Sequence, residues 1–169
     1  MDIEKVGVVG CGLMGSGIAE VCARSGYSTA VLEVNQQFLD KGMTSLRSSL
    51  DKAVSKGELS AQDRDATVPR LHGTIKMEDF KNCDFVIEAA VENVPLKWEV
   101  FKKLDEVTPK ETILASNTSS ISITRIATAT QRPDRVIGMH FFNPVPVMKL
   151  IEIIRGLATS DETFRITRE

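Results

Sequence analysis

Val6-Gly7-Val8-Val9-Gly10-Cys11-Gly12-Leu13-Met14-Gly15 is the stretch from which the fold of this 169-residue chain can be inferred. A short apolar run ends in glycine, and apolar residues then recur at helical spacing as far as Gly26. Between them, Gly10, Gly12 and Gly15 form a G-x-G-x-x-G turn. The first glycine permits a tight bend, the second lets a pyrophosphate approach the backbone, and the third lets the helix pack closely on the strand. The alternative is a glycine-rich turn that simply connects two elements.

The alternation of strand and helix continues along the chain. Strands are expected at residues 6–9, 29–33, 74–75, 84–88, 112–115 and 135–139, with a further strand-like run at 147–154. Helices are expected from the glycine turn to Gly26, from Phe38 to about Lys56, from Ser60 to Leu71, from Leu96 to Val107 and from Ile121 to Ala129. Alternating elements build parallel sheets that helices cover on both faces. We therefore expect an α/β fold of the Rossmann type, with a doubly wound, mostly parallel sheet.

The length of the chain indicates one domain, spanning residues 1–169. Its last segment, from Ser160 to Glu169, opens like a helix and is then cut off. We therefore expect the domain to be truncated near its C-terminal end, with further sequence downstream.

The composition is that of a globular protein, with 42% apolar residues, 26% charged residues and a formal charge of −2. The near balance of charge argues against binding to nucleic acid or to a membrane surface. No apolar run approaches the roughly 20 residues of a transmembrane helix, and strand-like sequence at the N-terminus leaves no room for a signal peptide, so we expect a cytoplasmic protein. Cys11, Cys22 and Cys83 contain no C-x-x-C pair, and we expect neither a disulfide framework nor a metal site.

Glu33 ends the second expected strand, where dinucleotide-binding folds place a carboxylate against the ribose hydroxyls of the adenosine. Its charge would repel the 2′-phosphate of NADP, and Asn35-Gln36-Gln37 contains no arginine that could attract one. We therefore expect NAD as the cofactor. The alternative is that Glu33 is an ordinary charged residue at the end of a strand.

Two histidines are candidates for acid–base catalysis, His72 and His140. His72 lies in a polar connection, Arg-Leu-His-Gly, and is expected to be a solvated loop residue. His140 ends a strand, so it should lie at the carboxyl edge of the sheet, where open α/β folds bind ligands. A histidine with a pKa near neutrality can remove the proton of an alcohol while a hydride leaves its carbon. The alternative for His140 is a core histidine with backbone partners.

Glu152 lies inside the apolar run Met148–Ile154, where a charge is costly unless it has a partner. His140 is the expected partner, because a carboxylate can orient an imidazole and stabilise its protonated form. The alternative is a surface ion pair between Glu152 and Lys149.

Ser116-Asn117-Thr118-Ser119-Ser120 follows the fifth expected strand and supplies hydroxyls and backbone donors at the same edge. These residues are also typical helix N-caps, and Ser119 or Ser120 is expected to cap the next helix while another hydroxyl faces a substrate. Glu92 and Lys97 bracket the turn after the fourth strand, and as isolated charges they carry no functional signal.

Five stretches, taken together and in order, closely resemble the 3-hydroxyacyl-CoA dehydrogenase family, including the 3-hydroxybutyryl-CoA dehydrogenases. They are Gly10–Gly15, Glu88-Ala89-Ala90-Val91-Glu92-Asn93, Ser116–Ser120, His140-Phe141-Phe142-Asn143-Pro144-Val145-Pro146 and Lys149-Leu150-Ile151-Glu152. The resemblance covers essentially the whole chain, and the stretch after His140 is far more specific than the glycine turn.

The resemblance implies reversible, NAD-dependent oxidation of an L-3-hydroxyacyl-CoA to a 3-oxoacyl-CoA in fatty-acid metabolism, for which β-oxidation is one direction. By matching positions, His140 would be the catalytic base, Glu152 its partner, and Ser119 a contact of both substrate and nicotinamide. The implied cofactor contacts are Gly10, Gly12, Leu13, Met14, Gly15, Glu33, Glu92, Lys97, Ser119 and Asn143. Ser49 and Lys56 match positions that touch coenzyme A, and a lysine suits the CoA phosphates as a point charge.

The chain departs from the family in two ways. Glu33 stands where the family usually has aspartate, which keeps the ribose chemistry and lengthens the reach. The family also continues into a helical C-terminal domain that contacts substrate and forms the homodimer, and this domain is absent here. The chain alone would then bind NAD and turn over poorly or not at all, with exposed apolar surface where that domain docks. Two alternatives to a dehydrogenase remain: a dinucleotide-binding module, and a structural relative without turnover.

Overall fold

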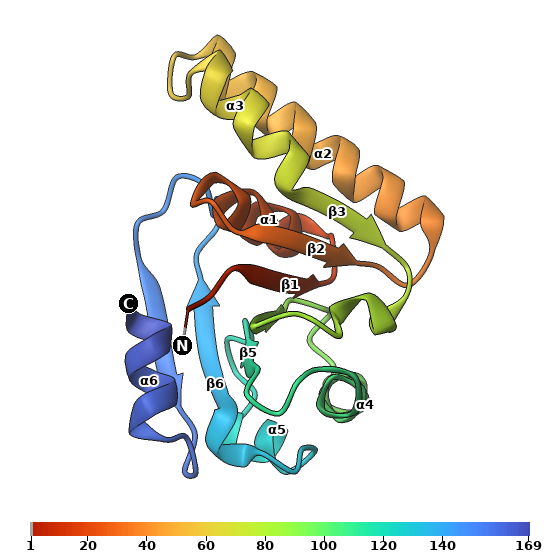
Figure 1. Cartoon of the computed structure of the whole chain (residues 1–169), viewed down its shortest axis with the longest axis vertical. Coiled ribbons are helices and arrows are strands. Elements are labelled where there is room, and N and C mark those ends of the chain that lie inside the picture. Colours follow the sequence, from red (N-terminus) through yellow and green to blue (C-terminus); the bar gives the residue numbers. More distant parts are fainter. Residues whose placement is uncertain (1) are drawn as a thin grey trace.

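Seven strands form one sheet, in the order β3-β2-β1-β4-β5-β6-β7, in the computed structural model, which describes residues 2–169 (Figure 1). The strands are β1 (Lys5–Val9), β2 (Ser28–Leu32), β3 (Leu71–Thr74), β4 (Phe85–Glu88), β5 (Ile113–Ser116), β6 (Val136–Phe141) and β7 (Ile151–Arg155). Strands β1 to β6 run parallel, and β7 pairs antiparallel with β6. The prediction of a mostly parallel, Rossmann-type sheet is confirmed.

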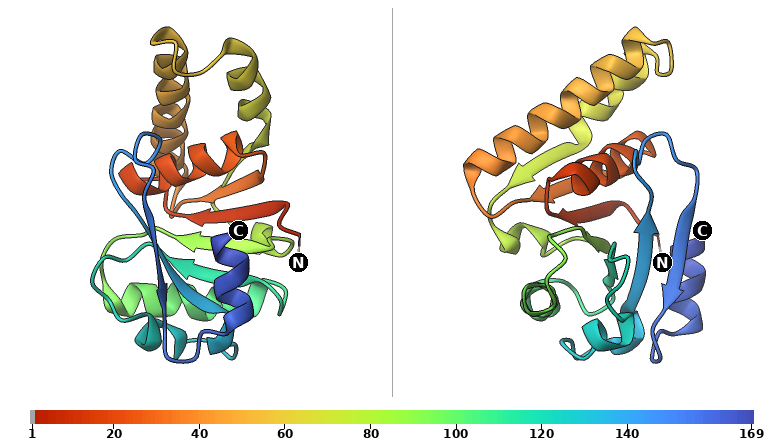
Figure 2. Two further views of the ribbon diagram at one scale, coloured as in Figure 1. Left: turned by 90° about the vertical axis from the view of Figure 1, so that its left-hand side faces the viewer. Right: turned by 180° about the vertical axis from the view of Figure 1, so that it is seen from behind.

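Helices cover both faces of this sheet (Figures 1 and 2). They are α1 (Leu13–Arg24), α2 (Gln36–Ser55), α3 (Ala61–Thr67), α4 (Val94–Val107), α5 (Ile123–Ala127) and α6 (Asp161–Arg168), with short 3₁₀ turns at Val68–Arg70, Met77–Phe80 and Pro133–Arg135. Helices α1, α2 and α6 pack into one core cluster, and α4 and α5 pack into a second. No helix within residues 2–169 combines the length and apolarity that crossing a bilayer requires.

The central strands β1, β4 and β5 are apolar except at one end, because both of their faces are buried. In β1, Val8 faces the cluster of α1 and α2, whereas Val9 faces the cluster of α4 and α5. The neighbouring β4 alternates in the same way, with Ile87 on the first side and Val86 on the second. This alternation follows from the two-residue period of a strand, and it explains why these segments read as continuous apolar runs.

The helices α2 and α3 extend beyond the end of the sheet as a pair (Figure 2). The side chain of Asn35 caps α2 by accepting a hydrogen bond from the N–H of Phe38, and Ser60 caps α3 through the N–H of Asp63. Leu46 and Leu50 of the long helix α2 are buried in the core. This projecting pair carries the positions at which the resemblance expects coenzyme A.

The structure corrects several expected boundaries. The third strand lies at Leu71–Thr74 instead of residues 74–75, so His72 is an exposed residue of an edge strand and not of a loop. The expected helix from Ser60 to Leu71 divides into α3 and a 3₁₀ turn, because Pro69 interrupts it. The run at 147–154 forms a strand only from Ile151 onward.

A buried ion pair joins the end of α4 to the segment just before β6. Asp105 and Arg132 lie 2.7 Å apart, with side chains 8% and 6% exposed. The Arg132 guanidinium also donates hydrogen bonds to the carbonyl oxygens of Asp105, Thr108 and Pro109. Burial raises the pKa of Asp105, but hydrogen bonds from Arg132 and from the N–H of Gln131 outweigh it, so this pKa lies below its ordinary value.

We expect Arg132→Met to lower the free energy of unfolding by roughly 3–5 kcal/mol at neutral pH, because it leaves a buried carboxylate without its partner. Stabilisation by a carboxyl of lowered pKa is complete above its unfolded pKa and disappears as the pH falls through the folded pKa. The difference from wild type should therefore shrink in acid. Urea unfolding at several pH values measures it, with exposed Arg125→Met as control; equal stability of the two variants would contradict the prediction.

Candidate active site

The chain reverses the order of its strands between β1 and β4, and open α/β sheets bind ligands at the carboxyl ends of the strands at such a point. The glycine turn follows β1, and the segment 89–93 follows β4. The turn after β5 and the end of β6 lie on the same edge. The sequence-predicted cofactor and catalytic residues are therefore brought to one side of the sheet.

The glycine turn packs too closely for side chains at two of its three glycines. Gly10 has a positive φ of 93°, and its N–H donates to the carbonyl oxygen of Leu32 at 2.8 Å. A Cβ at Gly15 would collide with the carbonyl oxygen of Gly10. Gly12 differs, since a Cβ there would meet no atom within 4 Å. The open space at Gly12 is on the solvent side of the turn, where a ligand can approach the backbone.

The N-terminus of α1 has no side-chain cap and no acidic residue in its first turn. The helices α2 to α6 each have a capping side chain, which is Asn35, Ser60, Asn93, Ser122 or Ser160. Helix N-termini with free N–H groups attract anions. The turn Gly10–Gly15 thus fits the pyrophosphate of a dinucleotide in both shape and electrostatics.

Glu33 lies directly after β2 and faces the glycine turn. One carboxylate oxygen accepts a hydrogen bond from the N–H of Cys11 at 2.7 Å, and the other accepts from the N–H of Val34 at 2.9 Å. Burial, with a smaller effect of the Glu33 charge, raises the pKa of the Cys11 thiol to about 11. Cys11 is therefore a neutral packing residue, and the carboxylate is fixed beside the turn.

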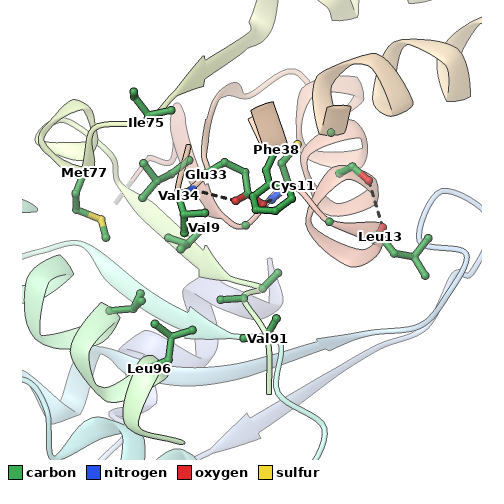
Figure 3. A pocket seen from close by; sticks show the side chains of 18 of the residues that line it. Val9, Cys11, Leu13, Glu33, Val34, Phe38, Ile75, Met77, Val91 and Leu96 are labelled. Atoms are coloured by element: carbon green, nitrogen blue, oxygen red, sulfur yellow. Dashed lines mark hydrogen bonds between the residues drawn. The ribbon is translucent and has the colours of Figure 1, made fainter. Parts of the chain in front are cut away.

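A cavity of about 880 Å³ extends from the glycine turn past Glu33 (Figure 3). Its wall beyond Glu33 is apolar and is formed by Val34, Phe38, Ile75, Met77 and Leu96. Such a wall suits a flat aromatic base. These five residues were not predicted from the sequence, because they come from separate segments that no motif connects.

His140 and Glu152 occupy directly opposed positions on the antiparallel strands β6 and β7. The Nδ1 atom of His140 lies 2.9 Å from Oε2 of Glu152, and the two side chains are 21% and 54% exposed. The expected His–carboxylate pair is present, and Glu152 pairs with His140 and not with Lys149. The pair was predicted because a charge buried in an apolar run needs a partner. That reason is wrong, because Glu152 is largely solvated and β7 is an exposed edge strand.

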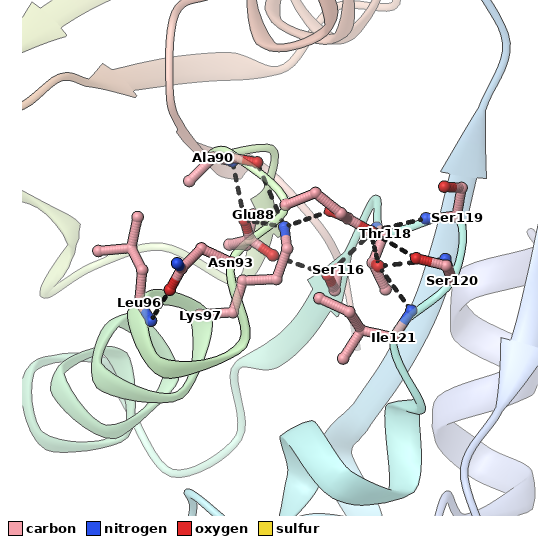
Figure 4. A network of polar contacts seen from close by, with 11 residues as sticks. Glu88, Ala90, Asn93, Leu96, Lys97, Ser116, Thr118, Ser119, Ser120 and Ile121 are labelled. Atoms are coloured by element: carbon pink, nitrogen blue, oxygen red, sulfur yellow. Dashed lines mark hydrogen bonds and ion pairs between the residues drawn. The ribbon is translucent and has the colours of Figure 1, made fainter.

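Hydrogen bonds to β4, to Glu92 and to β6 hold the turn at 116–120, and Figure 4 shows those around Ser116 and Thr118. Asn117 accepts a hydrogen bond from the N–H of Phe141, which joins the turn to the end of β6. The N–H of Ser119 donates to Glu92 at 3.2 Å, and the side chain of Ser119 is exposed. Neither Ser119 nor Ser120 caps the next helix; Ser122 does so, since α5 begins only at Ile123.

Glu92 and Lys97 are not isolated charges. The Lys97 ammonium, 1% exposed, lies 2.7 Å from Glu88 and 3.2 Å from Glu92, and it also donates to the carbonyl oxygen of Ala90 at 3.3 Å. Burial raises the pKa of Glu92, but the hydrogen bond from Thr118 and the charge of Lys97 outweigh it and leave this pKa below its ordinary value. No role was predicted for Glu88 from the sequence. A carboxylate at the end of an apolar strand could have indicated a buried charge that needs a partner.

Comparison with known proteins agrees with this geometry. The family model of the 3-hydroxyacyl-CoA dehydrogenase NAD-binding domain matches residues 5–169. The chain belongs to this family. A probable 3-hydroxybutyryl-CoA dehydrogenase of Deinococcus radiodurans is 52% identical over 98% of the chain and 59% of its own length. The 3-hydroxybutyryl-CoA dehydrogenase of Bradyrhizobium diazoefficiens is 46% identical over 99% of the chain and 57% of its own length.

A solved structure of (S)-3-hydroxybutyryl-CoA dehydrogenase from Ralstonia eutropha superimposes with a TM-score of 0.96 at 46% identity, covering 99% of the chain and 59% of that protein. The chain thus spans a little under three fifths of the length of these relatives. The expected fold, family and NAD-binding character are confirmed by these matches.

Three further positions are expected from the 3-hydroxyacyl-CoA dehydrogenase family. Ser49 is half-buried on α2 near the buried Glu20; burial raises the pKa of Glu20, and Ser49 and Arg24 partly offset this effect. Lys56 is exposed at the C-cap of α2, two helical turns beyond Ser49. Asn143 is exposed just after β6.

The described part of the chain contains no cluster of three or more potential metal ligands.

Alanine at two glycines of the turn should affect two different properties, NAD affinity and stability. Gly12→Ala keeps the fold, because its Cβ meets nothing, but it fills the space of the pyrophosphate and weakens NAD binding by about 10- to 100-fold, the loss of at least one hydrogen bond to a charged group. Gly15→Ala collides with backbone and lowers stability by about 1–3 kcal/mol. Calorimetric titration with NAD and thermal unfolding measure both. Unchanged NAD affinity in Gly12→Ala would place the cofactor elsewhere.

Proposed function

We propose that this chain carries the cofactor site and the catalytic pair of a dehydrogenase that interconverts L-3-hydroxyacyl-CoA, such as 3-hydroxybutyryl-CoA, and 3-oxoacyl-CoA. The observation that carries the proposal is the His140–Glu152 pair, which stands at the same edge of the sheet as the glycine turn. The relatives from Deinococcus radiodurans and Bradyrhizobium diazoefficiens are named for this class of reaction. The role in β-oxidation, a cytoplasmic location and a homodimer are part of the proposal.

His140 is suited to hold the proton of the substrate hydroxyl. With Nδ1–H donating to Glu152, the neutral ring leaves Nε2 as an acceptor for that proton. Glu152 fixes the ring and stabilises its protonated form by a short, partly solvated ion pair. In the reverse direction the protonated ring returns the proton to the oxygen of the keto group.

The residues around the glycine turn are suited to hold NAD, which when bound supplies the hydride acceptor. We place the pyrophosphate on the backbone of Gly10, Gly12, Leu13, Met14 and Gly15, the adenosine ribose at Glu33, and the nicotinamide half near Glu92, Ser119 and Asn143. The apolar wall of the cavity would take the adenine.

The acyl-CoA would approach from the side of β6 and α2. Ser119 would orient the acyl group, and Ser49 and Lys56 would contact the CoA moiety. Apolar side chains are exposed on the segment before and within β7, with Val147 66%, Leu150 55% and Ile154 38% exposed. We propose that the additional domain present in longer relatives covers this surface, completes the substrate pocket and forms the dimer.

His140→Gln should lower kcat/KM for acetoacetyl-CoA reduction by roughly 10²–10⁴-fold, the contribution of a positioned acid–base group. The measurement follows the absorbance of NADH in a protein extended to the length of its relatives. His72→Gln is the matched control, because His72 is an exposed residue on the far edge strand and should leave the rate unchanged. Equal rates in wild type and His140→Gln would exclude the mechanism.

Binding of NAD without turnover is the second candidate function. It is favoured by the exposure of the catalytic pair, which no part of the described chain covers on the Glu152 side. Absence of acetoacetyl-CoA reduction in the extended wild-type protein, together with tight NAD binding, would select this alternative.

Glu33→Gln should reduce the preference for NAD over NADP by on the order of tenfold, because it removes a negative charge beside the expected 2′-phosphate position. The glutamine oxygen can still accept the hydrogen bond of Cys11 in the glycine turn, whereas the hydrogen bond from the N–H of Val34 is lost. The ratio of dissociation constants for NAD and NADP measures the effect. A ratio that does not change would show that Glu33 does not face the adenosine ribose.

A further inference from the structure

The ion pair of Glu88 and Lys97, beneath the proposed nicotinamide site, is completely buried. Glu88 is 0% exposed at the end of β4, and Lys97 is 1% exposed in the first turn of α4. Two buried charges are stable only when they are paired and their remaining hydrogen-bonding atoms are satisfied. Both conditions hold here, so this pair has a defined geometry.

Every donor of the Lys97 ammonium has an acceptor within the chain. The three N–H groups meet Oε1 of Glu88 at 2.7 Å, Oε2 of Glu92 at 3.2 Å and the carbonyl oxygen of Ala90 at 3.3 Å (Figure 4). A lysine ammonium has three donors and no acceptor. Lys97 therefore has no donor left for a cofactor, and its burial keeps it from the surface of the cavity.

Glu88 connects this ammonium to the next strand. Its Oε1 also accepts the N–H of Ala90 at 2.7 Å, and its Oε2 accepts the hydroxyl of Ser116 at 2.7 Å. Ser116 is the last residue of β5, immediately before the turn that contains Ser119. The buried carboxylate thereby fixes the ends of β4 and β5 relative to α4.

Glu92 is the exposed member of the network and touches the turn directly. Its side chain is 41% exposed; one oxygen is held by Lys97, and the other accepts hydrogen bonds from Thr118 and from the N–H of Ser119 at 3.2 Å. The position of Ser119 therefore depends on Glu92, and the position of Glu92 depends on Lys97.

We infer that Lys97 and Glu88 are positioning residues, which act on the nicotinamide end of the site only through Glu92 and the Ser119 turn. The inference rests on the proposed function, in which Glu92 and Ser119 face the cofactor. It replaces a direct contact between Lys97 and NAD, which the sequence resemblance implied, with an indirect one.

A double-mutant cycle between Lys97 and Glu92 tests the inference, with the dissociation constant of NADH, measured by its fluorescence, as the readout. Lys97→Met and Glu92→Gln should each weaken NADH binding about tenfold, the loss of one charge-assisted contact, and the double variant should also weaken it only about tenfold. Lys102→Met, an exposed lysine of the same helix, is the matched control and should not change binding. A hundredfold loss in the double variant, or an unchanged constant in Lys97→Met, would overturn the inference.

Lys97→Met leaves Glu88 buried without a counter-charge, so this variant can lose stability. Adding Glu88→Gln removes that charge, and the cycle is then repeated in the Glu88→Gln background. Recovery of the melting temperature with NADH binding still about tenfold weak would support a positioning role, whereas recovery of wild-type binding as well would show a purely structural one. Because NADH binding needs no turnover, the cycle remains informative if acetoacetyl-CoA is not reduced, an outcome that contradicts only the proposed reaction.

Discussion

The close approach of α1 to β1 is the constraint on which the rest of the site depends. The helix can start directly above the end of the strand only because the backbone at Gly10 and Gly15 meets without intervening side chains. That contact directs the uncapped N-terminus of α1 into the cavity at the switch point of the sheet. With the turn in place, Glu33 from β2 and the segment after β4 converge on the same space.

Charge is used in two different ways around this space. The Glu88–Lys97 pair is buried, fully hydrogen-bonded and connects three elements, so it gives rigidity. The His140–Glu152 pair is partly solvated and joins β6 only to the edge strand β7, which leaves the imidazole accessible. The rigid Glu88–Lys97 pair lies beneath the proposed cofactor site, and the accessible imidazole of His140 lies beside it. This arrangement is compatible with proton transfer at a precisely held substrate.

Local patterns in the sequence predicted much of this arrangement. Strands with two buried faces read as apolar runs, glycines are required where the backbone makes close contact, and His140 ends a strand whose direction the alternation fixes. The pairing of His140 with Glu152 was also predicted, although for a reason that the exposure of Glu152 contradicts. The boundaries near Pro69 and before β7 were less accurate, because short irregular segments carry no periodicity.

The sequence alone determined the fold class, the phosphate-binding turn and the identity of the groups available for chemistry, since each depends on neighbours along the chain. Only the tertiary structure decided which distant groups meet. The burial of Lys97 between Glu88 and Glu92, the capping of α5 by Ser122 and the apolar wall around Phe38 and Met77 are examples. These features depend on the packing of a helix against particular strand ends, and neither residue spacing nor composition specifies that packing.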